Sequence, residues 1–266
     1  MIPTLNLHDI QYSQLDSKTW CATAQVTASC PLIFSDLFSN STLLLNANLS
    51  NINTDKFCHI TWHYYIPNAS LSARKIAYEQ RQQQRAGVRL LLQSLLNKLN
   101  INDSLDDLSF PYRLVNSQYY VCFSHTGRSS PNTSTQPSGG KPFNGLDNKV
   151  AVVISFHRPV GIDIETNNLE WRVAKRFYHM NEIAILQTLT FMQRDTVAKL
   201  LWQIKESFIK IHQYKLAQGL GMDYSYLITG LVNGIEEQAQ LSLAFNDDKT
   251  GYYLVLLPKR QTVIVY

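Results

Sequence analysis

The chain has 266 residues, of which 45% are hydrophobic and 17% charged, and its formal net charge is +4. This composition is typical of a folded globular protein and carries no signature of disorder. The charge is too small and too scattered to indicate nucleic-acid binding, although it suits an acidic protein partner. No apolar run approaches the roughly 20 residues that a membrane-spanning helix requires. The length allows one or two domains with a sizeable core.

The cysteines indicate the compartment. All four are widely spaced, and no Cys-x-x-Cys pair occurs among Cys21, Cys30, Cys58 and Cys122. This usage is typical of small buried thiols in a reducing compartment. Residues 1–9 lack the basic region and apolar core of a signal peptide. The sequence therefore predicts a cytoplasmic protein.

The first half of the chain gives few clear elements. Residues 1–56 predict one weak strand, at 20–28, and residues 57–66 predict another because they are aromatic and β-branched. His59 and His63 lie in that second stretch. A His-x-x-x-His pair needs a helix to bring both rings to a metal, so ordinary core and surface histidines are favoured over zinc ligands.

A long helix is predicted after the capping residues 67–70 and ends near Leu99. Leucines give it a buried face, and five cations give it a basic face: Arg74, Lys75, Arg81, Arg85 and Arg89. Such a basic face is usually solvated.

The second half is more regular. Strands are predicted at 118–123, 149–156 and 160–165, with a Ser-, Thr-, Pro-, Gly- and Asn-rich loop at 127–148. A broken helix follows at 169–190, then a long helix at 195–214 and late strands at 240–245, 252–257 and 262–265. The order of elements predicts an α+β fold whose two halves roughly echo each other, without a visible sequence repeat.

The second long helix has two distinct faces. Apolar residues at three- and four-residue steps form a stripe suited to a core: Leu200, Ile204, Phe208 and Ile211. Trp202, Glu206 and Lys210 recur at four-residue steps and form a second ridge. The simplest interpretation of the last two is a solvated ion pair worth roughly 0.3–0.5 kcal/mol.

A second stretch argues against that interpretation. Asp163 and Glu165 follow the apolar run 150–154, and residues two apart on a strand share a face. Two like charges placed side by side repel each other unless a cation lies between them. If Glu206 approaches the same point, three carboxylates converge on a hard-cation site. Asp163, Glu165 and Glu206 are therefore predicted metal ligands.

Two motifs carry a family resemblance. Gly161-Ile162-Asp163-Ile164-Glu165 and Trp202-x-x-Lys205-Glu206-Ser207-Phe208-Ile209-Lys210 lie about forty residues apart. Together, in this order, they resemble the signature of the Sfp-type 4′-phosphopantetheinyl transferases. The resemblance spans most of residues 118–225 and includes further segments: Phe123-Ser124-His125-Thr126-Gly127-Arg128, residues 176–178 with Glu182, and Gly219-Leu220-Gly221.

The resemblance implies a fold. It predicts a monomer built as a pseudo-twofold pair of α+β subdomains, with coenzyme A in the cleft between them. The N-terminal subdomain would be 1–157, with the basic helix, the His segment and an insertion at 127–148. The C-terminal subdomain would be 158–266, with the acidic strand and the Lys-Glu-Ser helix.

The resemblance also implies a reaction. Members move 4′-phosphopantetheine from coenzyme A to a serine of an apo acyl or peptidyl carrier protein and release 3′,5′-ADP. Magnesium, with manganese as a substitute, would bridge the pyrophosphate oxygens and neutralise their charge. The implied catalytic residues are Asp163, Glu206 and Lys210. Whether Glu206 is a general base, a metal ligand or both is left open by the sequence.

The coenzyme A ligands that the resemblance implies are mostly cations. His125 would face the 3′-phosphate and Lys210 the pyrophosphate, and the full set is Ser124, His125, Arg85, Lys205, Lys210 and Lys215. Gapless alignment of the basic helix lands on Gln84, and we prefer Arg85 because it carries the charge. Trp202 is assigned to packing.

Two other functions stay open from the sequence. Paired carboxylates also suit a metal-dependent phosphoesterase, although no familiar His/Asp metal cluster is visible. The other is a catalytically silent protein that binds coenzyme A or a carrier. The presence of four residues argues against it: Asp163, Glu165, Glu206 and Lys210. The pathway of the carrier is open, and neither nucleic acid nor a membrane is expected as a partner.

Overall fold

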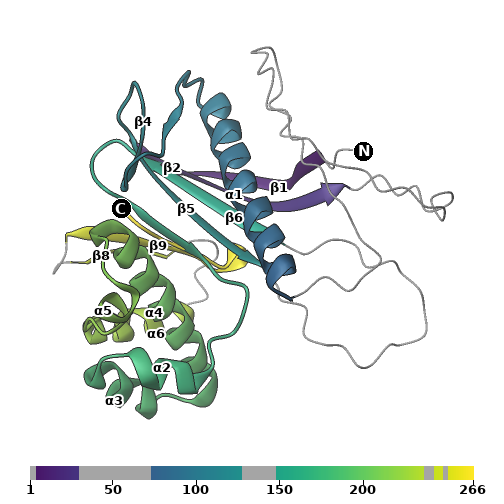
Figure 1. Ribbon diagram of the computed structural model, residues 1–266. Coiled ribbons are helices and arrows are strands. Elements are labelled where there is room, and N and C mark those ends of the chain that lie inside the picture. Colours follow the sequence, from purple (N-terminus) through teal and green to yellow (C-terminus); the bar gives the residue numbers. More distant parts are fainter. Residues whose placement is uncertain (1–3, 30–72, 128–147, 237–242, 248–250) are drawn as a thin grey trace, which may run out of the picture.

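The computed structural model describes residues 4–29, 73–127, 148–236, 243–247 and 251–266 (Figure 1). The strand predicted at 57–66 and nearly all of the loop predicted at 127–148 lie outside these residues. Within them, no helix is both long enough and apolar enough to cross a membrane.

The first sheet has six antiparallel strands in the order β1-β2-β6-β5-β4-β3. Their bounds are β1 Thr4–Asp16, β2 Thr19–Ser29, β3 Leu105–Asp106, β4 Tyr112–Leu114, β5 Tyr120–Gly127 and β6 Asn148–Ser155. The long helix α1 (Ala73–Lys98) crosses one face of this sheet (Figure 1). Its leucines Leu91, Leu92, Leu95 and Leu96 pack on apolar residues of β2, β5 and β6.

The second sheet has four antiparallel strands in the order β7-β10-β9-β8. Their bounds are β7 Gly161–Ile164, β8 Leu243–Asp247, β9 Tyr252–Leu257 and β10 Thr262–Val265. Helix α4 (Phe191–His212) packs on β7 and β10. The shorter helices complete this half: α2 Trp171–Phe177, α3 Met180–Thr188, α5 Leu216–Leu220 and α6 Ile228–Glu236.

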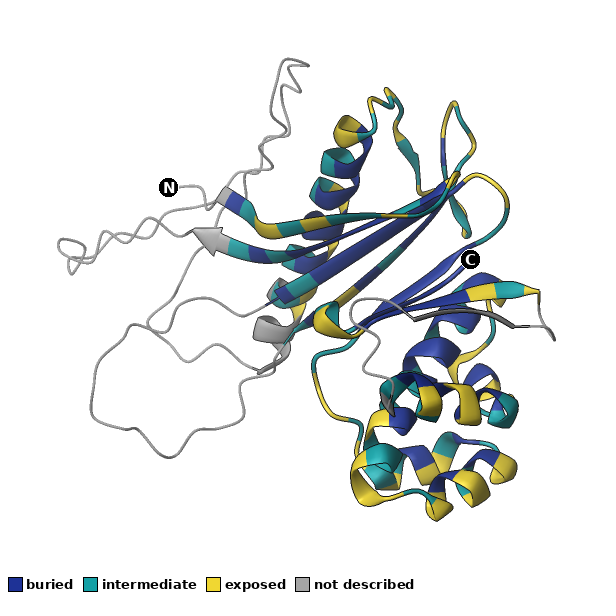
Figure 2. Ribbon diagram, turned by 180° about the vertical axis from the view of Figure 1, so that it is seen from behind, coloured by how far each residue is buried: buried dark blue, intermediate teal, exposed yellow. Residues whose placement is uncertain are grey.

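The two sheets pack face to face, so the molecule has four layers: helix, sheet, sheet and helices. Strand alternation builds them, since successive side chains point to opposite faces. On β6, Val152 and Ile154 face the α1 side, whereas Ala151 and Val153 face the second sheet. Strands β6, β7 and β10 are therefore buried along most of their length, whereas the edge strand β1 is mostly half-buried or exposed (Figure 2).

Local signals explain where α4 begins and ends. The Thr190 hydroxyl accepts from the Gln193 amide, and the Gln193 side chain accepts from the Thr190 amide, which makes a capping box. At the other end Gln213 takes the left-handed conformation with φ of 58° and stops the helix.

Helix α4 and strand β7 lie unusually close together. A Cβ atom on Gly161 would lie 2.2 Å from the carbonyl oxygen of Ser207. Only glycine therefore lets the acidic strand sit directly against the helix that carries Glu206 and Lys210.

The predicted α+β class is confirmed, and the helices predicted from after residue 70 to about 99 and at 195–214 correspond to α1 and α4. Strand β1 and helix α6 were not predicted. The pseudo-twofold relation, the boundary at 157/158 and the monomeric state remain predictions.

Candidate active site

Strand β5 presents its side chains alternately to the two halves of the molecule. Ser124 and Thr126 are buried against β7 of the second sheet, while His125 points to the opposite face and is exposed. The Ser124 hydroxyl donates to Asp163 Oδ1 at 3.0 Å, and the Thr126 hydroxyl donates to Glu165 Oε1 at 3.1 Å. The two acidic residues are thus held from the neighbouring sheet.

Lys210 forms an ion pair with Asp163. Its Nζ lies 3.0 Å from Asp163 Oδ1 and donates to the carbonyl oxygen of Ile162 at 2.7 Å and to Ser124 Oγ at 3.3 Å. Burial lowers the pKa of Lys210, but the surrounding anions, Asp163 foremost and Glu206 among them, raise it by more, so the pKa is raised. The ammonium therefore stays charged at any physiological pH.

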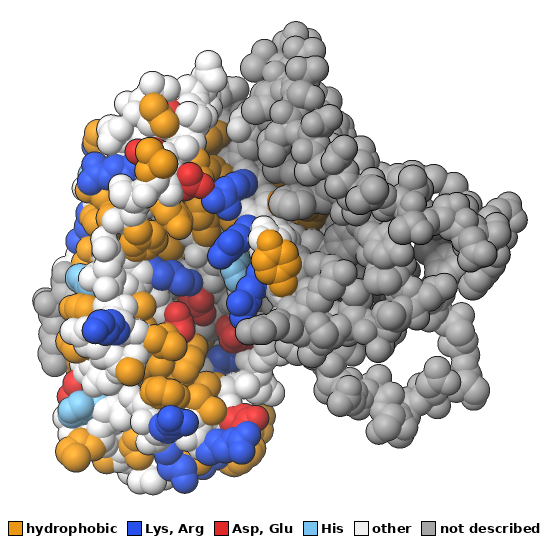
Figure 3. Space-filling model, in the orientation of Figure 1, with side chains coloured by type: hydrophobic (Ala, Val, Ile, Leu, Met, Phe, Trp, Pro, Cys, Tyr) orange, Lys and Arg blue, Asp and Glu red, His pale blue; other side chains and the backbone are white. Residues whose placement is uncertain are grey.

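Glu206 lies one turn before Lys210 and is half-buried. Burial raises the pKa of its carboxyl group, the Lys210 cation lowers it, and Asp163 and Glu165 raise it again. The net pKa is raised. Glu206, Asp163 and Glu165 are therefore close enough to repel one another, and Figure 3 shows acidic, basic and histidine side chains meeting in the middle of one face.

The carboxylates of Asp163, Glu165 and Glu206 are not arranged as a complete set of metal ligands. In the described part of the chain, no group of three His, Cys, Asp or Glu side chains is arranged to hold a metal ion. The donor chemistry nevertheless suits a hard cation, because Asp163 and Glu165 both repel the carboxylate of Glu206 and Lys210 is paired with Asp163. Burial is the main cause of the raised pKa of Glu206, and a divalent cation would offset the repulsion from Asp163 and Glu165 that adds to it.

His125 lies beside α1 and its basic face. Partial burial lowers the pKa of the imidazole, and the Lys210 and Arg85 cations lower it further, although Asp163 acts in the opposite direction. Arg85 is exposed, whereas Gln84 is buried and donates to Asn148 Oδ1 at 3.2 Å. Of the two candidates on the basic helix, Arg85 is thus the exposed cation, and it acts electrostatically on His125.

Lys205 was predicted to bind coenzyme A, and the structure corrects that prediction. Its side chain is fully buried, with Nζ 2.9 Å from Glu182 Oε1, and it donates to the carbonyl oxygens of Leu220 and Met222. The rings of Tyr178 and Tyr224 lie 5.0 and 5.3 Å from the amine. The physical reason is helical geometry, because successive residues point about 100° apart and Lys205 falls on the core side of α4.

Two other residues lie apart from the cluster. Lys215 is exposed immediately before α5, and no contact within the described residues joins it to Asp163, Lys210 or His125. Trp202 packs on Phe177 and Tyr178, with ring centroids 6.2 and 6.3 Å away, as expected of a packing residue.

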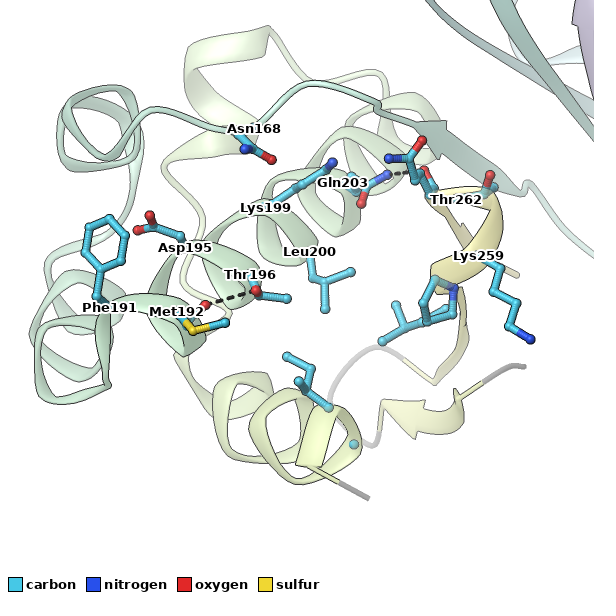
Figure 4. A pocket seen from close by; sticks show the side chains of 15 residues that line it. Asn168, Phe191, Met192, Asp195, Thr196, Lys199, Leu200, Gln203, Lys259 and Thr262 are labelled. Carbon is cyan, nitrogen blue, oxygen red and sulfur yellow. Dashed lines mark hydrogen bonds between the residues drawn. The ribbon is translucent and has the colours of Figure 1, made fainter. Parts of the chain in front are cut away.

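A pocket of about 650 Å³ adjoins the base of the site (Figure 4). It lies between the N-terminal half of α4, α6 and the turn from β9 to β10, and Phe191 and Met192 form part of its wall. Lys199 and Gln203 connect it to the acidic strand. Burial lowers the pKa of Lys199 and Glu165 acts in the opposite direction, while Gln203 donates to the carbonyl oxygen of Asp163 at 3.4 Å. None of the predicted catalytic residues lines this pocket.

Sequence reasoning missed the hydrogen bond by which Thr126 holds Glu165. The signal for Thr126 was present, because the hydroxyl residues at 124 and 126 have the same two-residue spacing as the acids at 163 and 165. The spacing alone does not say that β5 and β7 are neighbours.

The segment that contains the acidic strand and helix α4 matches a known protein family. Residues 159–249 match the family model described as the 4′-phosphopantetheinyl transferase superfamily. This segment contains β7, α4 and the three predicted metal ligands, so the match confirms the resemblance indicated by the two motifs.

Part of the chain is also similar to a curated 4′-phosphopantetheinyl transferase. The chain is 38% identical over 81 residues to the 4′-phosphopantetheinyl transferase gsp of Aneurinibacillus migulanus. The similar segment covers 27% of this chain and 34% of the relative, so the match spans about a third of the relative's length.

Proposed function

We propose that the protein transfers the 4′-phosphopantetheine group of coenzyme A to a serine of an apo acyl or peptidyl carrier protein and releases 3′,5′-ADP. The observation that carries this proposal is the cluster of Asp163, Glu206 and Lys210, held by Ser124 where the two sheets meet. The cluster lies within the segment that matches the superfamily. In the reaction, the serine hydroxyl attacks the β-phosphorus of coenzyme A, and the bond to the departing 3′,5′-ADP breaks.

Glu206 is assigned as the general base of this reaction. A carboxylate that accepts the serine proton works best when its pKa lies near the operating pH, and in the metal-free protein burial, together with Asp163 and Glu165, raises the pKa of Glu206 in that direction. Its half-buried position also limits water access. A role as metal ligand is compatible with this one, because a carboxylate has two oxygens.

Asp163, Glu165 and Glu206 would hold the divalent cation, Mg²⁺ or Mn²⁺. When bound, the cation supplies charge neutralisation on the pyrophosphate and stabilises the leaving phosphate. Lys210 is anchored by Asp163 and Ile162 and directs a permanent positive charge at the same pyrophosphate.

His125 and Arg85 are assigned to the 3′-phosphate. Both are exposed, and the Arg85 cation on α1 is close enough to act electrostatically on His125 of β5. Lys215 is a further exposed cation for the coenzyme, whereas Lys205 is excluded by its burial. Ser124 acts on the coenzyme through Asp163 and Lys210, because its buried hydroxyl contacts both. We propose that the protein acts as a cytoplasmic monomer.

Intact-mass measurement of candidate carriers tests the proposed reaction. The protein is incubated with coenzyme A, MgCl₂ and apo carriers of fatty-acid, polyketide and nonribosomal-peptide type, with Glu206→Gln as the matched control. We expect at least one carrier to gain the mass of phosphopantetheine with the wild type and none to do so at a comparable rate with the variant. Loss of phosphate from coenzyme A without carrier modification would indicate a phosphoesterase instead. Coenzyme A binding without any turnover would indicate a silent binding protein.

A further inference from the structure

Strands β5 and β7 face each other across the boundary between the two sheets and are linked by side chains. In the described chain β7 pairs through its backbone with β10, and β5 pairs with β4 and β6. The links between β5 and β7 are the hydroxyls of Ser124 and Thr126, which reach Asp163 and Glu165. Each hydroxyl meets the acid 39 residues further along the chain, so the two strands run in matching register.

The two carboxylates are held in the same manner. Asp163 accepts from Ser124 and Lys210 through Oδ1, and Glu165 accepts from Thr126 and from the Asn167 amide, at 2.7 Å, through Oε1. Among the described residues, no hydrogen bond is made to Asp163 Oδ2 or Glu165 Oε2. Each acid therefore has one oxygen fixed by the protein and one oxygen available to a ligand.

Thr126 is the side chain that fixes Glu165 from the opposite strand. Its side chain is 6% exposed, and its hydroxyl lies 3.1 Å from Glu165 Oε1 and 3.4 Å from Thr166 Oγ1. A threonine hydroxyl has a single proton, so donation to Glu165 leaves its lone pairs to accept from Thr166. The β-branched side chain is stiff about χ1, which keeps the donor aimed at one place.

We propose that Thr126 is a positioning residue that turns Glu165 so that Oε2 faces the divalent cation. This inference rests on the proposed metal site. It assigns Thr126 a role through Glu165 and not through the coenzyme, because a hydroxyl that is buried and committed to a carboxylate does not reach a phosphate. Residues that orient metal-binding carboxylates commonly change metal affinity by roughly 10–100-fold when they are altered.

The test compares three variants by their affinity for Mn²⁺. Thr126→Val removes the hydroxyl at nearly constant shape, and Thr126→Ser retains it. Thr19→Val is the matched control, because Thr19 is a buried threonine of the same sheet whose hydroxyl contacts Ser155 at 3.3 Å, at the far end of β6. Mn²⁺ binding is followed by electron paramagnetic resonance in the presence of coenzyme A and the absence of any carrier. Thermal unfolding without metal is measured in parallel.

We expect Thr126→Val to weaken Mn²⁺ binding by roughly 10–100-fold, while Thr126→Ser stays within a few-fold of the wild type. Thr19→Val should lower the melting temperature without changing Mn²⁺ affinity. Wild-type Mn²⁺ affinity in Thr126→Val would overturn the proposal, as would a failure of the wild type to bind Mn²⁺. Because no carrier takes part, loss of Mn²⁺ binding in Thr126→Val would support the proposal even if the transferase assay gave no product.

Discussion

Lys205 and Glu206 are neighbours in the sequence with opposite environments. The lysine is enclosed by Glu182 and two tyrosine rings, whereas the glutamate faces the acidic strand. A one-residue step around a helix is enough to separate a side chain of the core from one of the site. A motif match treats both as site residues, because it depends only on the order of residues. It contains no information on the direction in which each side chain leaves the helix.

Substitution of Lys210 should impair coenzyme A binding, whereas substitution of Glu206 should impair turnover. Lys210→Ala removes a cation from a polyanion site, so coenzyme A affinity should fall by roughly tenfold or more, with a difference from wild type that shrinks as salt screens it. Glu206→Gln retains size and hydrogen bonding, so coenzyme A should still bind while turnover falls by roughly 10²–10⁴-fold. Coenzyme A titrations and single-turnover rates measure the two effects. Near-wild-type turnover by Glu206→Gln would contradict the assigned base.

His125 should couple nucleotide binding to proton uptake. Its pKa is lowered in the free protein, and a nearby phosphate would raise it, so binding in the pH range between the two values takes up a proton. The affinity for 3′,5′-ADP should therefore increase as the pH falls through that range. Calorimetric titrations in buffers of different ionisation enthalpy count the protons. His125→Ala should retain only the weaker pH dependence of the phosphate itself, and an unchanged dependence would remove His125 from the 3′-phosphate.

At the scale of elements, the contact between α4 and β7 depends on Gly161. Gly161→Ala would place a methyl group against the Ser207 carbonyl and should destabilise the fold by about 1–3 kcal/mol. Urea unfolding measures this. Gly230→Ala is the control, because Gly230 is an exposed residue of α6 with open space around its Cα, and alanine there should stabilise the helix by about 0.5–1 kcal/mol. Equal effects at the two sites would show that the close approach is unimportant.

The elements that the sequence predicts well are those with strong local signals. Strands β9 and β10 begin and end as predicted, because Gly251 and Pro258 bound the first and both are apolar runs. Helix α6 was missed since Thr229, Gly230 and Gly234 are poor helix formers. It forms because Ile228 and Leu231 bury themselves in the core around α4, which local propensity cannot reveal.

Strand β1 was missed for a different reason. Its pairing with β2 is interrupted by a register shift between His8 and Gln11, where Asp9 has a φ of 51°. A bulge of this kind breaks the alternation of polar and apolar residues by which an edge strand is recognised.

At the scale of the whole molecule, the buried pair of Lys205 and Glu182 ties together α4, α3 and the segment after α5. Lys205→Met leaves an unpaired buried carboxylate and should destabilise the protein by about 3–5 kcal/mol. The double variant Lys205→Met, Glu182→Leu should recover much of that loss. Urea midpoints give the stabilities, and coenzyme A affinity of the folded fraction should stay unchanged. A salt-dependent loss of coenzyme A affinity would restore Lys205 as a phosphate ligand.

The sequence predicts the site only as far as its motifs reach. Asp163, Glu206 and Lys210 were found because they lie in two short patterns, and the structure brings them together. The hydroxyls that hold them, and the burial of Lys205, depend on contacts between strands and helices distant in the sequence. Such contacts follow from the packing of two sheets, which no local pattern encodes.

The contact between the two sheets should also slow the exchange of a backbone amide proton with solvent. The amide of Ile164 donates to Ser124 Oγ at 3.1 Å, so a side chain of one sheet protects a backbone proton of the other. That proton exchanges with solvent only when the sheets separate locally. A coenzyme and cation bound to β7 and α4 should slow this separation. The rate of deuterium uptake at the Ile164 amide therefore reports how often the sheets separate. The amide of Leu254, inside the second sheet, should keep its rate whether or not ligands are present.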